Sequence, residues 1–239
     1  MKVKIIPCLT DNYSYLIIDE KSNSACVVDP GEADPVIDYL ENKNVKLDFI
    51  LNTHHHFDHI GGNKKLKEKY QAKIVGFIGD KVRIPEIDIL VNDKDIWKEK
   101  NFKAEITHIP GHTSGHICYH FFQEKIIFTG DTLFSLGCGR IFEGTYLQMY
   151  NSLKFFKNLE PDTKIYFGHE YTLKNSNFCL RYDPKNENLK NKIKKIRHKL
   201  DQNLPSSPST IKDENECNVF LRANSLEDFS KLRDLKDNF

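Results

Sequence analysis

The chain has 239 residues, of which 39% are hydrophobic, 11% aromatic and 29% charged. This composition excludes a membrane-embedded or wholly disordered protein, and the length suffices for one or two domains with a full core. The 35 Lys and Arg residues balance the 34 Asp and Glu residues to a net charge of +1. No global field recruits nucleic acid or anionic lipid, so an anionic substrate must meet a local basic patch.

The first 20 residues contain only short apolar runs, which are broken by Pro7 and Asp11. They match neither a signal peptide nor a membrane span, so we expect a cytoplasmic protein without a membrane partner. The six cysteines are scattered and form no C-x-x-C pair, which indicates reduced thiols rather than a disulfide framework or zinc ribbon. The histidines are more informative, because four of them fall within residues 54–59.

Apolar runs that end in turn residues predict many strands in the first two thirds of the chain. A helix is expected over residues 34–44, with Asp34 as its N-cap and Pro35 at its first position, and another over 62–70. Strands interspersed with helices predict layered α/β architecture. The expected strands are residues 3–9, 13–19, 24–31, 47–53, 72–79, 104–111, 117–123, 125–131 and 164–170.

The composition changes near residue 173, beyond which the chain is rich in lysine and asparagine. We therefore predict two domains, a catalytic domain over residues 1–172 and a small helical domain over 173–239. In the helical domain, residues 189–200 repeat apolar side chains at helical spacing, and residues 225–239 form a final helix capped by Ser225. The expected buried face of the first helix is Leu189, Ile193, Ile196 and Leu200, and that of the last is Leu226, Phe229, Leu232 and Leu235. We interpret the basic face of residues 189–200 as solvated rather than nucleic-acid-binding.

The strongest chemical signal is the run Thr-His-His-His-Phe-Asp-His over residues 53–59. Imidazole and carboxylate groups suit zinc and similar ions. Alternate residues of an extended segment share a face, so His54 and His56 point together while His55 points away. If the chain then turns into a helix, Asp58 and His59 reach a second point nearby.

Three more polar residues, His112, Asp131 and His169, each follow an apolar run and a glycine. Each is a weak signal alone, but with residues 53–59 they supply enough ligands for two ions. His54, His56 and His112 are expected to bind one metal ion, and Asp58, His59 and His169 the other. Asp131 is expected to bridge the ions, because a carboxylate has two oxygens to share.

The spacing of these residues resembles that of a known family. T-H-x-H-x-D-H-x-G-G, P-G-H-T-x-G-H, T-G-D-T-L-F and G-H-E-Y-T, in this order, are similar to the metallo-β-lactamase fold. The fold hosts many chemistries, so these motifs alone imply no substrate. The segments F-S-L-G-C-G-R-I-F-E-G-T, P-S-T-I, N-V-F-L-R and L-R-D-L-K-D-N-F are more narrowly similar to the glyoxalase II, or hydroxyacylglutathione hydrolase, family. The resemblance extends over essentially the whole chain.

The resemblance implies an α/β fold, the four-layer αβ/βα sandwich of the metallo-β-lactamases, followed by a small C-terminal helical domain. It also implies substrate contacts: Arg140 and Arg222 for the carboxylates of glutathione, and Tyr171 beside them. Two positions depart from the family pattern. Phe142 stands where a tyrosine is common, and Ser225 lies where a second basic residue is often found. These departures bear on glutathione affinity rather than on hydrolysis.

The implied activity is metal-dependent hydrolysis of S-D-lactoylglutathione to D-lactate and glutathione, a step in methylglyoxal detoxification. Two ions about 3.5–4 Å apart can lower the pKa of a shared water towards ~7. Asp58 can hold or accept the proton, so Asp58 and Asp131 are the candidate catalytic residues. The thiolate leaving group needs no strong acid, because thiols have a pKa near ~8.5.

Two alternatives stay open. One is another hydrolase of the fold, such as a thioesterase for a different thiol carrier; the net charge of +1 disfavours a nuclease. The other is an iron-dependent glutathione persulfide dioxygenase, although the full ligand set with His59 and His169 points to two metals. We expect zinc, with iron or manganese also compatible. We further expect a monomer with a small glutathione thioester as its only partner.

The remaining candidates have less distinctive settings. His55 is expected to pack or hydrogen-bond nearby, and His116 to support a ligand rather than to be one. Asp29 can either orient a metal-binding histidine or simply end a strand. Cys138 is not expected to be a nucleophile, since it has no basic partner in sequence. His108, His120 and His198 are interpreted as ordinary strand or surface residues.

Overall fold

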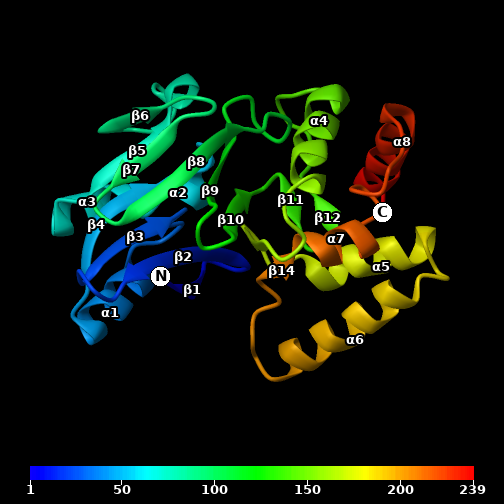
Figure 1. The fold of residues 1–239 in the computed structure, drawn as a ribbon, viewed down its shortest axis with the longest axis horizontal. Helices are drawn as coiled ribbons and strands as arrows, with labels where there is room; N and C mark the ends of the chain where they lie inside the picture. The colour runs from blue at the N-terminus through cyan, green and yellow to red at the C-terminus, as the bar shows by residue number, and fades with distance from the viewer. The chain divides into compact units, whose positions relative to one another are not determined.

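The computed structural model describes residues 1–239, and six of its strands form a mixed sheet in the order β1-β2-β3-β4-β5-β6. The first three strands are antiparallel, and β3 to β6 are parallel neighbours. Figure 1 shows these strands in blue to cyan. Their bounds are Lys2–Cys8 (β1), Asn12–Asp19 (β2), Ser24–Val28 (β3), Lys46–Leu51 (β4), Lys73–Phe77 (β5) and Ile89–Val91 (β6).

Helices α1 (Asp34–Lys43) and α3 (Asn63–Tyr70) connect these strands and share their core. Val36 and Leu40 of α1 and Leu66 of α3 are fully buried among aliphatic side chains of β2, β3 and β4. The short helix α2 (Phe57–Ile60) and the 3₁₀ turn η1 (Ile78–Asp80) lie in the connections. Burial of these apolar faces is the main favourable contribution to folding here.

An antiparallel meander completes this part of the chain, with strands β7 (Ile96–Glu99), β8 (Phe102–His108) and β9 (Ile117–Phe121). Together with the first sheet it makes up the first of two compact units, which we call unit 1 (residues 1–108 and 115–124). Unit 2 consists of residues 109–114 and 125–239.

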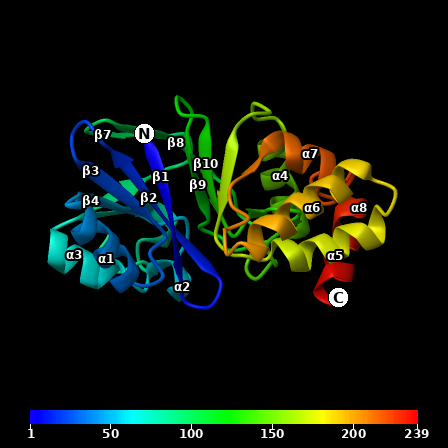
Figure 2. The ribbon, with the colours of Figure 1, turned by 90° about the horizontal axis from the view of Figure 1, so that it is seen from below.

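Unit 2 contains three strands in the order β14-β13-β10, a small hairpin and five helices. Strands β10 (Ile126–Gly130) and β13 (Lys164–Phe167) are parallel, and β14 (Ser209–Thr210) pairs antiparallel with β13. The hairpin is formed by β11 (Leu133–Phe134) and β12 (Gly137–Cys138). The helices, which gather beside one another in Figure 2, are α4 (Tyr146–Lys157), α5 (Thr172–Tyr182), α6 (Glu187–Asp201), α7 (Ile211–Cys217) and α8 (Leu226–Asp237).

The helical tail follows the sequence pattern in part. Ser225 caps α8, since its side chain accepts a hydrogen bond from the backbone N–H of Asp228. Leu189, Ile193 and Ile196 of α6 are buried as expected, whereas Leu200 is only partly buried. The expected buried face of α8 is wrong at Leu235, which is 47% exposed, because Arg233 occupies the buried side beside Phe229. That arginine finds hydrogen-bond acceptors there, which a leucine pattern cannot reveal.

Other predictions need correction at the ends of elements. Asp34 is the first residue of α1 rather than its cap; Ala33 precedes the helix and no side chain caps it. Helices α4, α5 and α7 and strands β6 and β7 were not expected. In α4 the buried Met149, Leu153 and Phe156 do recur at helical spacing, so this helix was missed although its pattern is present. The helices beyond residue 173 share unit 2 with β10 and β13. The division into domains at residue 172 stays a prediction.

None of the helices combines the length and the apolar character that crossing a lipid bilayer demands.

Candidate metal centre

The histidine run of unit 1 follows the end of β4 through a bend at Thr53 and His54, and His56 is extended just before α2 begins. His54 Nε2 and His56 Nδ1 lie 3.1 Å apart. Two donor atoms bound to one tetrahedral ion at 2.0–2.1 Å are about 3.3 Å apart, so this spacing suits a shared ion. The turn into α2 then brings Asp58 Oδ2 to 3.6 Å from His59 Nε2. The chain thus presents two neighbouring pairs of donors, as the strand-to-helix pattern predicts.

Asp29 lies beneath this run and is 4% exposed. Its Oδ1 accepts a hydrogen bond from the backbone N–H of Thr53 at 2.8 Å, and its Oδ2 accepts one from the Thr53 hydroxyl at 2.6 Å. His59 Nδ1 is 3.1 Å from the same Oδ2. Donation from Nδ1–H to Asp29 leaves the lone pair of His59 on Nε2, the nitrogen that faces Asp58. Asp29 therefore orients His59, which decides between the two interpretations of this residue.

Three further contacts in unit 1 order the neighbouring side chains. Asn12 Nδ2 donates to Asp58 Oδ2 at 2.9 Å and to its carbonyl oxygen at 3.2 Å. The ring of His116 stacks on that of His54, with 4.5 Å between centroids. His55 Nδ1 lies 3.5 Å from Asp80 Oδ2, away from the pair formed by its neighbours.

The ligand candidates of unit 2 meet because two parallel strands end side by side. Gly130 of β10 pairs with Phe167 of β13, and the Gly168 N–H donates to the Gly130 carbonyl at 2.9 Å. Gly130 has a φ of 47°, a conformation that glycine adopts without strain. The residue after each glycine is a ligand candidate: Asp131 follows Gly130, and His169 follows Gly168. His169 Nε2 lies 3.2 Å from Asp131 Oδ2.

His112 approaches the same carboxylate oxygen, with its Nε2 3.6 Å from Asp131 Oδ2. Its other nitrogen, Nδ1, is 2.8 Å from the carbonyl oxygen of Arg140, to which it can donate. Asp131 therefore contacts one imidazole from each of the two ligand sets expected from the sequence. Both imidazoles approach the same oxygen, Oδ2, rather than one oxygen each.

The loop that supplies the Arg140 carbonyl passes very close to Asp131. A Cβ atom at Gly139 would lie 1.9 Å from the Asp131 carbonyl oxygen and 3.2 Å from His112 Nδ1. Only glycine fits there, since Cβ contacts under 3 Å do not occur. The Gly139 N–H also donates to the Thr132 carbonyl at 3.1 Å. The G-C-G-R sequence thus reflects tight packing of this loop against the ligand candidates.

Two of the four residues expected to contact the substrate, Phe142 and Tyr171, have rings that lie against ligand candidates of unit 2. The Phe142 ring is 61% exposed, and its centroid is 5.2 Å from that of His112. The Tyr171 ring stacks on His169 at 4.7 Å, with 6° between the planes. An aromatic wall therefore flanks both imidazoles.

The two arginines are held by carboxylates of unit 2. Arg140 Nε lies 3.3 Å from Asp237 Oδ1 of α8. Arg222 Nη1 pairs with Asp183 Oδ2, next to the end of α5. Burial of Asp183 opposes its ionisation, but hydrogen bonds from Asn186 and Arg222 outweigh this and lower its pKa. Both guanidinium groups are about half exposed and can accept an anionic ligand.

The donor chemistry fits divalent metal ions. Each unit presents imidazole nitrogens and a carboxylate oxygen 3.1–3.6 Å apart. The opposite nitrogens of His59 and His112 meet an aspartate and a carbonyl, the partners that usually hold metal-binding histidines. Zinc, iron and manganese all suit such nitrogen and oxygen ligands.

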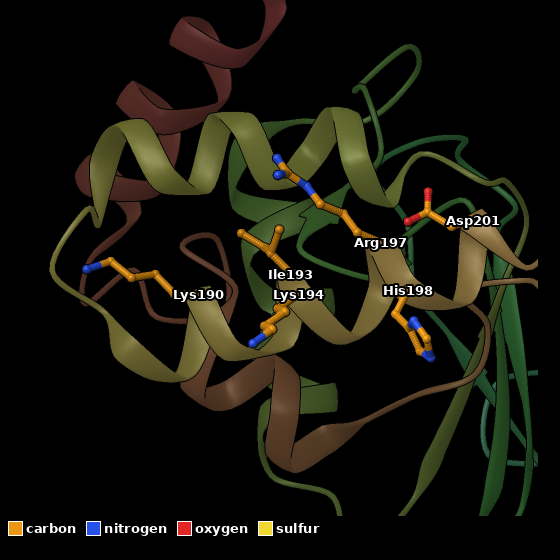
Figure 3. Close-up of a pocket in the computed structure, with 6 residues that line it drawn as sticks. All are labelled: Lys190, Ile193, Lys194, Arg197, His198 and Asp201. Carbon is orange, nitrogen blue, oxygen red and sulfur yellow. The ribbon is translucent and has the colours of Figure 1, made fainter.

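A shallow depression on α6 also contains a histidine and an aspartate, but it is not a metal centre. Figure 3 shows its side chains spread along a single helix, and they form no group of converging ligand atoms. It is lined by Lys190, Ile193, Lys194, Arg197, His198 and Asp201.

Cys138 is not a nucleophile in this structure. Burial is the largest influence on its thiol and raises its pKa, although Arg233 nearby acts in the opposite direction. A thiol held protonated is a poor nucleophile. Sequence reasoning excluded Cys138 but missed Arg233, which stands among apolar residues of α8 with no motif to mark it. It also missed Asn12, since a single asparagine at a strand start carries no functional signal.

The chain belongs to the metallo-beta-lactamase superfamily, which matches residues 9–169, more than half of its length. The remaining residues, 170–239, match the hydroxyacylglutathione hydrolase C-terminus. The solved structure of ETHE1 from Myxococcus xanthus has the same fold, with a TM-score of 0.75 and 24% identity over 98% of this chain and 90% of that one. The predicted fold class is therefore confirmed.

Within this superfamily the chain is a member of the hydroxyacylglutathione hydrolase family, as the sequence resemblance implied. A relative of that name from Pelagibacter ubique is 67% identical over 239 residues and covers 100% of both chains. Another from Prochlorococcus marinus is 44% identical over 231 residues, with 96% of this chain and 93% of the relative covered.

Proposed function

We propose that this protein hydrolyses S-D-lactoylglutathione to D-lactate and glutathione. One observation carries the metal-dependent part of the proposal: Asp131 Oδ2 lies 3.6 Å from His112 Nε2 and 3.2 Å from His169 Nε2. A carboxylate between two imidazoles suits a pair of ions. Relatives across the full chain are named hydroxyacylglutathione hydrolases, which supports the substrate.

We infer that two ions bind per chain, most favourably Zn²⁺, with iron or manganese as alternatives. The proposed ligands of one ion are His54, His56 and His112, and those of the other are Asp58, His59 and His169. Asp131 is the proposed bridge.

Two bound ions would supply a water of lowered pKa and an electrophile for the thioester carbonyl. Asp58 is the proposed proton acceptor. Its Oδ2 accepts a hydrogen bond from Asn12, which fixes the carboxylate. The leaving thiolate needs no strong general acid, because thiols have a pKa near ~8.5. A thioester is therefore an easier substrate here than an amide.

We propose that Arg140 and Arg222 bind the carboxylates of glutathione, and that Tyr171 and Phe142 line the approach to the thioester. Each guanidinium pairs with a carboxylate, Asp237 or Asp183, which fixes its orientation, and about half of each side chain stays exposed to meet a substrate carboxylate. The two rings lie against His169 and His112, next to the proposed site of reaction.

We further propose that the protein acts as a monomer in the cytoplasm. The proposed ligands and arginines all belong to one chain. All six cysteines are unpaired and buried, in keeping with a reducing compartment where glutathione is abundant.

A substrate screen tests the proposal. Zinc-loaded protein would be assayed with S-D-lactoylglutathione, with a lactoyl thioester of a different thiol carrier, and with glutathione persulfide in the presence of oxygen. We expect the first to be hydrolysed with the highest kcat/KM. Preference for the second carrier would assign a different thioesterase, and oxygen uptake with the persulfide would assign a dioxygenase.

A further inference from the structure

The last helix of unit 2 carries a buried arginine that the proposed chemistry does not use. Arg233 of α8 is 4% exposed, and its guanidinium lies 5.2 Å from the centre of the Phe220 ring. A buried charge is costly unless it is paired and hydrogen-bonded. The hydrogen-bond acceptors of Arg233 therefore identify the part of the structure that this residue stabilises.

Arg233 binds the backbone of the loop that packs on Asp131. Its Nη1 donates to the Cys138 carbonyl at 2.9 Å and lies 3.5 Å from the Gly139 carbonyl. Its Nη2 donates to Asp237 Oδ1 at 2.8 Å, one turn further along the helix. Arg233 thus fixes the two residues immediately before Arg140.

Arg140 has two separate roles in this arrangement. Its carbonyl oxygen accepts the hydrogen bond from His112 Nδ1 at 2.8 Å. Its side chain meets Asp237 twice, with Nε 3.3 Å from Oδ1 and Nη2 3.4 Å from the carbonyl oxygen. The backbone of one residue orients a ligand candidate, and its side chain is a proposed substrate contact.

We propose that Arg233 and Asp237 are positioning residues that place Arg140 from the C-terminal helix. Arg233 acts through the loop backbone on the orientation of His112, and hence on metal affinity. Asp237 acts through the guanidinium of Arg140 on substrate affinity. The first half needs only a metal site at His112, whereas the second half rests on the proposed function.

The rest of the loop is held by other side chains, so the effect of Arg233 is local. Residues 135–137 are bound from α5 and α7, where Glu214 accepts from the Leu136 N–H at 2.7 Å and is fully buried. Asn175 donates to the Ser135 carbonyl at 3.2 Å, and Asn218 to the Gly137 carbonyl at 3.0 Å. Loss of Arg233 should therefore loosen the Cys138 and Gly139 carbonyls, and with them the neighbouring Arg140 carbonyl, while the Arg140 guanidinium stays bound to Asp237 and the hairpin stays paired.

The first test measures Zn²⁺ affinity by competition with a chelator, starting from metal-free full-length protein. Arg233→Met should weaken Zn²⁺ binding by roughly 3- to 10-fold, less than the removal of a direct partner of His112 would, because Arg233 acts through the Arg140 carbonyl. Arg140→Ala should leave the Zn²⁺ affinity unchanged, because the backbone carbonyl remains. Lys231→Met is the matched control, since Lys231 is on the same helix and its only ion pair is an exposed one with Glu227.

The second test separates the two roles by kinetics with S-D-lactoylglutathione. Asp237→Asn should raise KM several-fold, with Zn²⁺ affinity changed by less than about threefold, since the amide oxygen still accepts from Arg233. Arg233→Met should instead weaken Zn²⁺ binding and leave KM nearly unchanged. A merely structural role would move both quantities together in both variants.

The outcomes are distinguishable. Unchanged Zn²⁺ affinity in a folded Arg233→Met overturns the positioning role. If that variant does not fold, Arg233→Lys takes its place: it keeps the charge, but its single nitrogen replaces the two that bind the Cys138 carbonyl and Asp237. Zn²⁺ affinity should again fall, and an affinity equal to wild type would overturn the role. A clear loss of Zn²⁺ affinity with no hydrolysis of any thioester, even by the wild type, would contradict the proposed function but not the role of Arg233.

Discussion

Asp29 Oδ2 lies 3.1 Å from His59 Nδ1 and 2.6 Å from the Thr53 hydroxyl. One buried carboxylate from the end of β3 thus ties the start of the histidine run to its last member. The φ of Asp29 is 48°, a left-handed value that aspartate adopts more readily than most residues, and it turns the chain where the side chain must reach both partners. The geometry identifies Asp29 as the residue that holds this segment in its binding conformation.

Asp29→Asn should weaken Zn²⁺ binding by roughly 10- to 100-fold, because an amide oxygen accepts a hydrogen bond from His59 less strongly than a carboxylate. Titration of the metal-free protein with Zn²⁺ measures this. Asp34→Asn is the control, since Asp34 forms only an exposed pair with Lys65 and such pairs contribute little. Equal Zn²⁺ affinity for the two variants would refute the role of Asp29.

His55 is predicted not to bind a metal ion, although it lies between two ligand candidates. It faces Asp80, whose carboxylate is fully buried and also pairs with Arg83. His55→Ala should therefore keep its metal content, while His56→Ala should lose one ion. Elemental analysis of both purified variants decides the point, and equally low metal in His55→Ala would contradict the geometry.

Local patterns in the sequence were sufficient to select the residues proposed as metal ligands. Alternation over His54 to His56 and the turn into α2 follow from strand and helix geometry, and the glycines before Asp131 and His169 mark strand ends. The helix cap at Ser225 was equally local. What the sequence could not show depends on contacts between distant segments. Arg233 interrupts the apolar face of α8 because it binds the backbone of a loop some 95 residues earlier. The role of Asp29 could be assigned only from its contact with His59 in the structure.

Lys236 of α8 should destabilise the fold at neutral pH. Burial, and then the charge of Arg233, lower its pKa to about 8 from the usual 10.5. Between these values the unfolded chain binds more protons than the folded one, so the free energy of unfolding should rise with pH from about 8 to 10.5. The penalty is fully present below pH 8.

Lys236→Met should remove this penalty, because a thioether suits the space between Phe178 and Phe239. The variant should be more stable than wild type by about 1–2 kcal/mol at pH 7, with the difference shrinking towards pH 10. Urea unfolding at both pH values measures it. Lys231→Met should show no such gain, and a pH-independent difference for Lys236→Met would contradict the explanation.

Arg140→Ala and Arg222→Ala should each raise KM for S-D-lactoylglutathione by roughly 10- to 100-fold, with kcat much less affected. A charge-assisted hydrogen bond contributes ~1.5–3 kcal/mol, and contacts remote from the thioester bind ground and transition states alike. KM of the wild type should also rise with salt. Arg197→Ala on the outer face of α6 is the control; if it matched the other two, the substrate contacts would be wrongly assigned.

The most direct test of the account is the number of metal ions per chain, measured by elemental analysis on protein whose thioesterase activity is assayed in parallel. We expect two ions in the fully active wild type, and loss of most metal and most activity in Asp131→Ala, since Asp131 contacts an imidazole of each set. Full activity with a single ion per chain, or an Asp131→Ala variant that retains both ions, would contradict a bridged two-metal centre.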